Sequence, residues 1–398
     1  MASALKNIIV VGGSYVGKTT AQELARVVPN THRILLIEPH SHFHHLFAFP
    51  RFAIVPGQEH KAFIPYSGLF SSLSSPTNHS VIQAQVLSIQ PNHVKLDREW
   101  QGSGQIPFEY LVVATGTRLT EPAGMRHNDK LSSVAYLQKH QADIKRAKSI
   151  LIAGGGAVGV QMATDLKEFY PDKEITVVQS RPHLMPQYHP KLHELIKERF
   201  DELGIKFITG SRIKVPSTGF PATTPFPVHL TDGTKLPSDF DFVILATGQT
   251  ANNSLLADLP VSPTSESLLN PANGFIRIRP TMQFLDEKYS NLFAVGDIAD
   301  TGLRKAARPG AAQAAVVAKN IHALVEGRQP AEEFSKAPAG IHLTLGLKYN
   351  VVFRNPNEAE GQTEPTIIKR FDGQEDMGVD GWWERLGVKI QGAQQYHL

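Results

Sequence analysis

Short runs of aliphatic residues alternate with amphipathic stretches along this chain, a pattern typical of proteins built on parallel sheets. The first run, residues 8–11, is β-branched and ends at a glycine, so it predicts a buried strand. Apolar positions then recur at helical spacing as far as Val28, and residues 33–37 predict a second strand. The turn between the first strand and the helix contains Gly12, Gly13, Ser14, Tyr15 and Gly17. This order of strand, glycine turn, helix and strand predicts a nucleotide-binding βαβ unit.

The glycine turn and Glu38 supply the chemistry of such a unit. A turn of this kind directs backbone N–H groups and the positive end of a helix dipole at one point, where a pyrophosphate can bind. Glu38 follows the second strand, 21 residues after Gly17, and a carboxylate there can accept both hydroxyls of an adenosine ribose. Ser14 replaces the middle glycine of the G-x-G-x-x-G pattern. Taken alone, the turn also fits a tight turn without a ligand, and only the complete unit favours a dinucleotide.

The same unit occurs a second time. Residues 150–153 predict a strand, residues 161–170 predict the start of a helix, and residues 173–179 predict the next strand. A complete fingerprint precedes this helix, with glycines at Gly154, Gly156 and Gly159. Because an internal duplication of this kind repeats one binding unit, we expect two dinucleotides held face to face.

The end of the second unit bears on the choice of nicotinamide cofactor. Gln179 stands 20 residues after Gly159, where an acid would bind the ribose and repel a 2′-phosphate. Ser180 and Arg181 follow it and offer a hydroxyl and a guanidinium to a phosphate. We therefore expect NADPH to be accepted at least as well as NADH. The alternative is that Arg181 is a solvated loop residue.

Further elements repeat the same organisation. Residues 111–117 and 242–248 predict buried strands that both end in Ala-Thr-Gly, and residues 292–297 predict a strand with Asp297 at its carboxyl end. The small residues at these ends, Thr115, Gly116 and Gly248, allow a ligand to approach the backbone. Residues 311–325 predict a helix, and Pro309 suits its first turn.

The predicted fold class is α/β, with two Rossmann-like dinucleotide-binding domains and a smaller C-terminal α+β region. We expect a discontinuous first domain of residues 1–118 and 248–330, a second domain of residues 119–247, and a C-terminal region of residues 331–398. Residues 81–96 predict a small meander, while residues 341–353 and 366–371 predict C-terminal strands. Two segments rich in proline and serine, 215–227 and 259–271, predict surface loops or hairpins.

Composition and charge narrow the classes of function. The 398 residues are enough for two or three domains. The hydrophobic content of 41% supports well-filled cores. The net charge is +3, from 40 basic and 37 acidic residues mixed along the chain, so no basic block indicates nucleic acid. The absence of cysteine excludes disulfides, cysteine-ligated metal and a thiol relay. No signal-peptide pattern opens the chain, and no apolar run approaches the roughly 18–20 residues of a membrane span. We expect a cytoplasmic protein, with peripheral contact to a membrane left open.

A histidine-rich segment follows Glu38. His40, His42, His44 and His45 suit a metal cluster by residue type, but no cysteine and no second set of carboxylate and histidine ligands lies nearby. We therefore predict no metal site. The alternative interpretation is a loop packed on the ligand of the first glycine turn.

The motifs together resemble the two-dinucleotide-binding flavoproteins. They are the opening G-G-S-Y-V-G, Glu38, the two Ala-Thr-Gly strands, G-G-G-A-V-G and the V-G-D that ends at Asp297. The segments FHHLFAFPR (43–51), KAFIPYS (61–67) and EFYPDKEITVVQS (168–180) are most similar to apoptosis-inducing-factor-like NAD(P)H:quinone oxidoreductases of the AMID or ferroptosis-suppressor type, which are related to type II NADH dehydrogenases. The similarity covers roughly residues 7–350.

This resemblance implies FAD on the first unit and NADH or NADPH on the second. The FAD contacts it implies are the turn of residues 12–17, Glu38, Arg51, the backbone near Val86, Thr115, Gly116, and Asp297 on the ribityl chain. The helix that starts at Pro309 and Ala311 would direct its N-terminus at the flavin pyrimidine edge, where negative charge develops on reduction. The resemblance also places His44 and His45 near the flavin, either as proton donors or in a packing role.

Two further positions bear on catalysis. The family usually has Glu where this chain has Gln161, and an amide can hydrogen-bond the nicotinamide carboxamide but cannot act as a base. Type II NADH dehydrogenases carry an Ala-Gln pair and a later Gln at the quinone pocket; this chain keeps Gln313 of the pair but has Val317 at the later position. The resemblance therefore supports flavin binding more firmly than quinone reduction.

The favoured hypothesis is an FAD-dependent NAD(P)H oxidoreductase that reduces a quinone-like small molecule, as a monomer or a homodimer. One alternative is a flavin-dependent oxidase or dehydrogenase of specialised metabolism with a degenerate NAD(P) site, which Gln161 and Gln179 would fit. Another is a non-enzymatic redox-sensing flavoprotein. Trp382 and Trp383 lie in a polar tail and fit either membrane contact or packing against the flavin domain.

Overall fold

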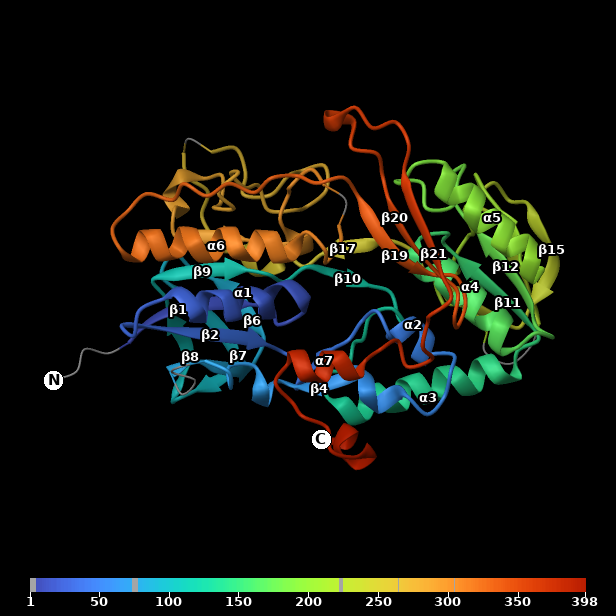
Figure 1. The fold of residues 1–398 in the computed structure, drawn as a ribbon, viewed down its shortest axis with the longest axis horizontal. Helices are drawn as coiled ribbons and strands as arrows, with labels where there is room; N and C mark the ends of the chain where they lie inside the picture. Colours follow the sequence, from blue (N-terminus) through green and yellow to red (C-terminus); the bar gives the residue numbers. More distant parts are fainter. Residues whose placement is uncertain (1–4, 74–77, 222–224, 264, 304) are drawn as a thin grey trace.

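The protein, seen here in a computed structural model, is described for residues 5–73, 78–221, 225–263, 265–303 and 305–398. Two parallel sheets with their helices lie side by side, and the C-terminal strands lie against the second (Figure 1). This topology confirms the predicted α/β class with two dinucleotide-binding units and a smaller C-terminal region. Residues 1–4, 222–224 and 264, which contribute to the predictions on targeting and on two loops, lie outside the described residues.

The first sheet has five parallel strands in the order β18–β9–β1–β2–β5. Val10 pairs with Leu36 on one side and Val112 on the other, and all three are fully buried. Continuous apolar runs form these strands because a parallel sheet is covered on both faces. The predicted strand of residues 292–297 ends at Ala294, and Asp297 lies in the turn after it. The strands are β1 Lys6–Val11, β2 His32–Glu38, β5 Ser80–Gln83, β9 Tyr110–Val113 and β18 Leu292–Ala294.

Helices α1 (Tyr15–Val27) and α6 (Gly310–Val325) pack against each other beside this sheet (Figure 1). Gly310 permits their close approach, because a Cβ at this position would lie 2.3 Å from Cγ2 of Val16. Pro309 precedes α6, as predicted for the first turn of a helix. The start of α6 is therefore fixed beside the first turn of α1.

The second sheet has four parallel strands in the order β13–β12–β11–β16. Its strands are β11 Ser149–Ala153, β12 Glu174–Val178, β13 Lys206–Ile208 and β16 Phe242–Leu245. The accompanying helices are α3 Lys130–Arg146, α4 Ala157–Phe169 and α5 Lys191–Leu203. A hairpin of β14 (Phe226–His229) and β15 (Lys235–Phe240) lies beside them. Helix α4 begins earlier than the predicted residue 161, directly after the glycine turn.

An antiparallel ribbon of β10 (Thr117–Leu119) and β17 (Gln249–Ala251) joins the two units. Its strands fall at the two places where we expect the chain to pass between domains. The first sheet draws its strands from both segments of the predicted discontinuous domain. The domain boundaries themselves stay a prediction.

The predicted meander of residues 81–96 is wrong in its first strand. Strand β5 pairs with β2 in the first sheet, since Val81 and Ile82 extend the buried apolar surface beside Leu36 and Ile37. The meander instead consists of β6 Val86–Ile89, β7 His93–Trp100 and β8 Ser103–Pro107. Two further strands, β3 (His42–His44) and β4 (Phe63–Pro65), form a hairpin around the short helix α2 (Phe49–Phe52).

The C-terminal region packs on both units rather than standing apart. Strands β19 (Gly340–Thr344), β20 (Asn350–Arg354) and β21 (Thr366–Arg370) form an antiparallel sheet, so the predicted stretch of residues 341–353 is a hairpin. Leu343, Leu345, Val351 and Phe353 belong to the core that also contains α2, α3, α4 and α5. The chain then crosses to the first unit and forms the short helix α7 (Asp380–Arg385).

Of the two alternatives predicted for the tryptophans near the C-terminus, packing against the first unit is the one that Trp383 adopts. Trp383 and Leu386 are fully buried and Val388 nearly so, all in the core of the first sheet. The indole nitrogen of Trp383 donates to the backbone oxygen of Lys61 at 2.9 Å. These side chains are therefore packed against the first unit, and the alternative in which they enter a membrane is excluded for them.

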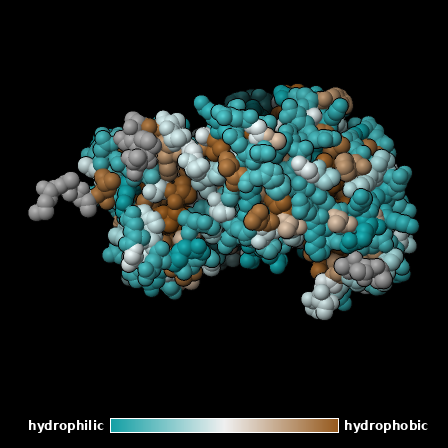
Figure 2. All heavy atoms as spheres, turned by 90° about the horizontal axis from the view of Figure 1, so that it is seen from below, coloured by the Kyte–Doolittle hydropathy of each residue, from teal (hydrophilic) through white to brown (hydrophobic). Residues whose placement is uncertain are grey.

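The face seen from below Figure 1 is mostly hydrophilic with separate hydrophobic patches (Figure 2). Within the described parts of the chain, every helix is too short or too polar to cross a membrane.

Candidate functional site

The first glycine turn is as tight as its sequence predicts. Gly12 has φ +100°, and a Cβ on Gly17 would lie only 1.8 Å from the backbone oxygen of Gly12. Ser14 ends the turn with φ −68° and ψ −167°, close to the −82° and −174° of Gly156 at the same place in the second turn. The backbone therefore keeps its phosphate-binding form at Ser14 although the middle glycine is missing.

Glu38 lies beside this turn, as the spacing predicts. It is buried, and its Oε2 accepts a hydrogen bond from the backbone N–H of Gly13. Its Oε1 accepts from the backbone N–H of His40 at 3.1 Å. Ala84 N–H donates to the backbone oxygen of Glu38, which fixes the chain two residues before Val86. The predicted ribose acceptor is thus held against the predicted pyrophosphate turn.

The second glycine turn reproduces the first. Gly154 has φ +118°, and a Cβ on Gly159 would lie 1.8 Å from the Gly154 oxygen. A Cβ on Gly156, by contrast, would meet no atom within 4 Å. Gln179 lies where Glu38 lies in the first unit, and its Oε1 accepts from Gly155 N–H at 3.3 Å. The open space at Gly156 fits the close approach of a pyrophosphate.

The two Ala-Thr-Gly turns also match each other. Gly116 and Gly248 have φ +60° and +66°, and a Cβ on either would meet nothing within 4 Å. Thr115 is fixed by Asn252, since its hydroxyl donates to the Asn252 oxygen at 2.8 Å while the Asn252 amide donates back at 2.9 Å. Both turns therefore leave room for a ligand beside the interdomain ribbon.

Asp297 lies close to the start of α6. Burial raises the pKa of Asp297, an effect opposed by the charge of Lys305 and a hydrogen bond to Thr117. Ala311 is exposed in the first turn of α6. Gln313 is buried, and its amide oxygen accepts from Gly296 N–H at 2.6 Å. In this structure Gln313 fixes the backbone next to Asp297.

His44 and His45, predicted as a pair, lie in different surroundings. His45 Nδ1 is 2.8 Å from the Tyr15 hydroxyl, and burial lowers the pKa of His45 to about 3. His44 packs against Phe49 and Phe63, and burial holds its pKa well below the usual value. Of the two histidines, only His45 therefore contacts the first turn of α1. Its imidazole is neutral at physiological pH.

An aromatic and cationic cluster surrounds Tyr15, and the sequence pattern did not single it out. Its members are Tyr15, Lys18, Phe43, His45, Phe47, Trp382 and Arg385. The Trp382 ring centroid lies 5.0 Å from those of both Tyr15 and His45. Phe47 stacks on Tyr15 at 4.5 Å yet is 51% exposed. Only the tertiary structure brings α7 to α1, so no local motif could have found this cluster.

Lys18 is the buried cation of this cluster. It is buried, and among the described residues its ammonium has no carboxylate partner. It donates one long hydrogen bond, 3.5 Å, to Thr19 and lies 5.8 Å from the Trp382 ring centroid. Burial, reinforced by Arg385 and Arg26, lowers the pKa of Lys18 to about 8.

Arg51 and Gln161 lie away from the first glycine turn. The Arg51 guanidinium is fully buried and donates to Asp165 at 2.6 Å and to Gly346 oxygen at 2.9 Å. We therefore do not include Arg51 among the proposed FAD contacts. Gln161 lies on α4 one turn before Asp165. Burial raises the pKa of the Asp165 carboxyl, an effect opposed by the charge of Arg51 and by an interaction with the Gln161 side chain. The Gln161 amide is therefore directed at Asp165 in this structure.

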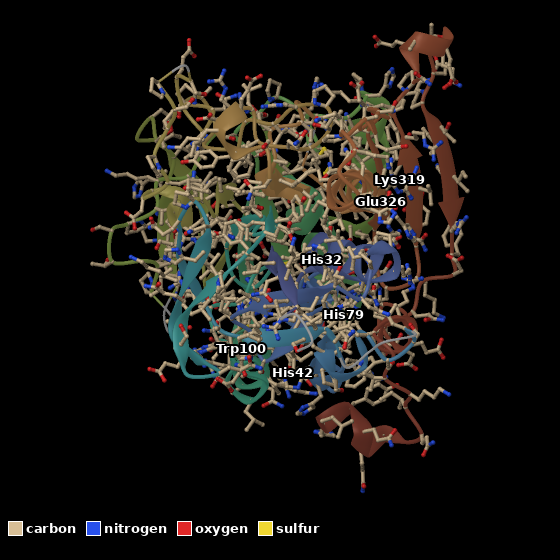
Figure 3. The ribbon with its side chains drawn as sticks, turned by 90° about the vertical axis from the view of Figure 1, so that its left-hand side faces the viewer. His32, His42, His79, Trp100, Lys319 and Glu326 are labelled. Atoms are coloured by element: carbon tan, nitrogen blue, oxygen red, sulfur yellow. The ribbon has the colours of Figure 1, made fainter. Side chains whose placement is uncertain are left out.

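The described histidines do not assemble into a metal site. Figure 3 labels His32, His42 and His79, which come from different segments and have separate partners. His32 bonds Glu109, His42 bonds the Leu398 oxygen, and His79 accepts from Ile34 N–H. Within the described part of the chain, no three or more histidine and carboxylate side chains group in a way that could hold a metal ion.

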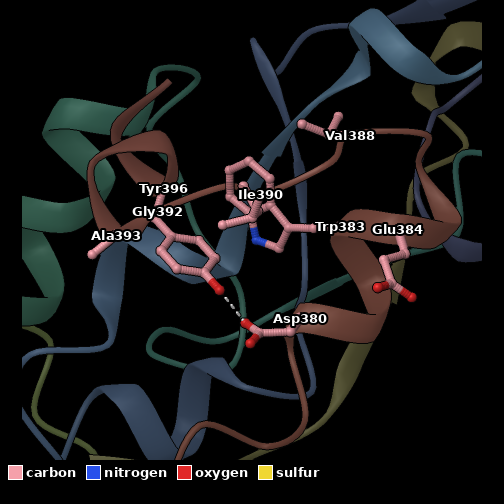
Figure 4. Close-up of a pocket in the computed structure, with 8 residues that line it drawn as sticks. All are labelled: Asp380, Trp383, Glu384, Val388, Ile390, Gly392, Ala393 and Tyr396. Atoms are coloured by element: carbon pink, nitrogen blue, oxygen red, sulfur yellow. Dashed lines mark hydrogen bonds between the residues drawn. The ribbon is translucent and has the colours of Figure 1, made fainter.

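A separate pocket lies on the C-terminal segment (Figure 4). Trp383 and Tyr396 line it, and the Tyr396 hydroxyl donates to Asp380. None of the predicted site residues lines this pocket.

Residues 6–318 match the model of the family described as "Pyridine nucleotide-disulphide oxidoreductase". The chain belongs to this family. Together with the two fingerprints and the space at Gly116, Gly156 and Gly248, this makes the protein an NAD(P)H-dependent flavoprotein oxidoreductase with FAD and NAD(P)H as cofactors. Since the sequence contains no cysteine, its own side chains supply no disulphide chemistry.

Individual relatives agree with the predicted resemblance. The chain is 33% identical over 404 residues to Fe-regulated protein 8 of Mycosarcoma maydis, covering 96% of this chain and 95% of that protein. It is 29% identical over 390 residues to ferroptosis suppressor protein 1 of Mus musculus, with 96% and 95% covered. The sulfide:quinone oxidoreductase of Aquifex aeolicus has the same fold, with a TM-score of 0.72 at 19% identity over 98% of this chain and 94% of that one. The resemblance to the ferroptosis-suppressor type is confirmed.

Proposed function

We propose that this flavoprotein passes electrons from NAD(P)H to a quinone-like acceptor, which binds at the Tyr15–Trp382 cluster. The observation that carries the proposal is the half-exposed ring of Phe47, which stacks on Tyr15. Tyr15 is the first residue of α1 and directly follows the first glycine turn. Flat aromatic faces favour a planar apolar molecule, because stacked rings add dispersion and electrostatic attraction to hydrophobic burial. The sulfide:quinone oxidoreductase of Aquifex aeolicus, which has the same fold and is named for a quinone, supports the same class of acceptor.

The residues of the first unit would hold FAD, and those of the second the nicotinamide dinucleotide. Glu38 would accept the ribose hydroxyls, the turn of residues 12–17 would bind the pyrophosphate, and Asp297 would bond the ribityl chain. FAD, when bound, supplies the two-electron chemistry that links a nicotinamide to an acceptor. The first turn of α6, with Pro309 and Ala311, would direct a positive helix end at the ring edge where charge develops.

Tyr15 and His45 would form a hydrogen-bonding pair at the acceptor. The Tyr15 hydroxyl hydrogen-bonds His45 Nδ1 at 2.8 Å and accepts from Phe47 N–H at 3.2 Å. Burial raises the pKa of Tyr15 far above its usual value, so the hydroxyl keeps its proton at neutral pH. With Nδ1–H of the neutral His45 donating to the Tyr15 oxygen, the Tyr15 hydroxyl would donate a hydrogen bond to an acceptor oxygen and keep its own proton. Lys18 would stabilise negative charge on the acceptor as it is reduced.

Stopped-flow absorbance on the purified holoprotein tests the proposal. NADH or NADPH added without oxygen should bleach the flavin, and a short-chain quinone mixed in next should restore the yellow colour rapidly. Phe47→Ala should slow the second step at least about tenfold while the first step changes little, since a stacked ring is lost from the acceptor side only. Phe371→Ala, which removes another exposed phenylalanine, is the matched control.

The outcomes separate the competing hypotheses. No bleaching with either nucleotide would favour an oxidase or dehydrogenase with a degenerate NAD(P) site. Bleaching followed by a long-lived complex that ignores quinones would favour a redox-sensing role. Equal quinone rates in wild type, Phe47→Ala and Phe371→Ala would reject the Tyr15–Trp382 cluster as the acceptor site.

A further inference from the structure

Two segments far apart in sequence meet at the carboxyl edge of the second sheet. Strands β12 and β13 run parallel, with Val178 paired to Ile208. Beyond them, Ser211 N–H donates to the Gln179 oxygen at 3.1 Å, and Gly210 N–H donates to the Arg181 oxygen at 2.9 Å. Residues 179–181 therefore lie against residues 210–212. Ligands of open α/β sheets bind at this edge, next to the glycine turn.

Gln179 leaves this edge without a negative charge. Its Oε1 accepts from Gly155 N–H and Ser180 N–H, at 3.3 and 3.1 Å, and its Nε2 donates to the His183 oxygen at 3.3 Å. The side chain is thus fixed as a neutral support for the glycine turn. A glutamate here would repel a second phosphate on the ribose, whereas this amide does not.

The two segments that meet here carry only positive charge, although Lys206 and Lys191 pair with Glu174 and Glu364 from outside them. Residues 175–193 and 203–231 contain no Asp or Glu, but they contain two arginines and three lysines, namely Arg181, Lys191, Lys206, Arg212 and Lys214. Arg181 and Arg212 are exposed, and within the described residues neither guanidinium has a hydrogen-bond or ion-pair partner. Ile213 points into the core, so the neighbouring Arg212 is free to face solvent at the sheet edge.

We propose that Arg181 and Arg212 together form a binding site for the 2′-phosphate of NADPH, which makes NADPH the preferred electron donor. The two guanidinium groups come from the ends of adjacent strands, and such groups bind phosphate through paired charge-assisted hydrogen bonds. Ser180 and Ser211 add hydroxyl donors next to them. This inference rests on the proposed function, in which the second fingerprint holds the nicotinamide dinucleotide.

Binding of 2′,5′-ADP and 5′-ADP to the holoprotein, measured by calorimetry, tests the site without turnover. The two probes differ only in the 2′-phosphate. Wild type should bind 2′,5′-ADP at least about tenfold more tightly, and Arg181→Ala and Arg212→Ala should each weaken that probe about tenfold, as expected for a lost charged hydrogen bond. Binding of 5′-ADP should stay within about twofold in both variants. Raising the salt concentration should reduce the difference between the probes, because it screens exposed charges.

Lys206→Ala is the matched control, since it removes one cation at the opposite end of β13 and should change neither probe. Equal affinities of the two probes in wild type, or equal losses for both probes in the arginine variants, would overturn the inference. If NADH nevertheless reduces the flavin and a quinone reoxidises it, the proposed function stands without this site. If the arginines select 2′,5′-ADP but no quinone is reduced, the site stands and the proposed acceptor is wrong.

Discussion

Arg51 Nε lies 2.6 Å from Asp165 Oδ2, and neither side chain has any exposed surface. Arg51 comes from α2 and Asp165 from α4, two helices far apart in sequence that belong to the same core. The same guanidinium donates to backbone oxygens of Gly346, Leu347 and Gln374 in the C-terminal region. One buried cation therefore ties α2, α4 and the C-terminal region together.

Removing the acid of this pair should destabilise the whole protein. Asp165→Ala leaves a buried guanidinium without its countercharge, and we expect a loss of about 3–5 kcal/mol in the free energy of unfolding. Urea unfolding followed by circular dichroism measures it. Glu364→Ala is the control, because it breaks the exposed Lys191–Glu364 pair and should cost less than about 1 kcal/mol. Similar losses in both variants would contradict the role assigned to the buried pair.

Glu38 should decide whether the protein keeps its flavin. Glu38→Ala removes the acceptor for the ribose hydroxyls and the bond to Gly13 N–H, so the purified variant should lose most of its FAD. The ratio of absorbance at the flavin band to that of the protein measures occupancy. Glu109→Ala, which removes a carboxylate paired with Lys6 and His32, should keep full occupancy. A fully yellow Glu38→Ala protein would show that the ribose assignment is wrong.

The two glycines of the second turn should respond differently to alanine. At Gly159 the added Cβ would lie 1.8 Å from the Gly154 oxygen, so Gly159→Ala should cost at least about 1–3 kcal/mol of stability. At Gly156 the added methyl meets no protein atom, so stability should change by less than about 0.5 kcal/mol. Gly156→Ala should instead weaken 5′-ADP binding, because the methyl takes up the space of the phosphate. Thermal unfolding and calorimetry separate the effects, and unchanged nucleotide affinity in Gly156→Ala would count against this placement.

The buried Lys18 should make stability depend on pH. Its pKa in the folded protein, about 8, lies below that of an unfolded lysine, so the unfolded chain binds more protons between about pH 8 and 10.5. The free energy of unfolding should therefore rise with pH in that window, with a contribution from Lys18 on the order of 3 kcal/mol. Lys18→Met should lose this part of the rise and be more stable at pH 7. The exposed Lys139→Met should keep the wild-type profile, and a Lys18→Met profile identical to it would refute the assignment.

Local constraints made most of the fold predictable. A glycine turn between a buried strand and a helix has one workable backbone form, and Gly12, Gly17, Gly154 and Gly159 show it in the positions the sequence predicts. The distance to Glu38 and Gln179 follows from the length of one helix and one strand, so both are found beside their turns. The absence of cysteine likewise settled part of the chemistry in advance.

The tertiary structure alone decided which distant segments meet. Arg51 has its partners on α4 and the C-terminal region, and Trp382 is brought to Tyr15 by the packing of α7. The segment of Gly210 lies against Arg181 because their backbones are hydrogen-bonded. Trp383 lies in a polar stretch of sequence that fits either membrane contact or packing, and the structure shows that it fills the core of the first sheet. Such contacts depend on burial and charge neutralisation summed over the whole chain, and no window of sequence contains both partners. The local sequence thus determined the two cofactor-binding turns, and the long-range packing determined what surrounds them.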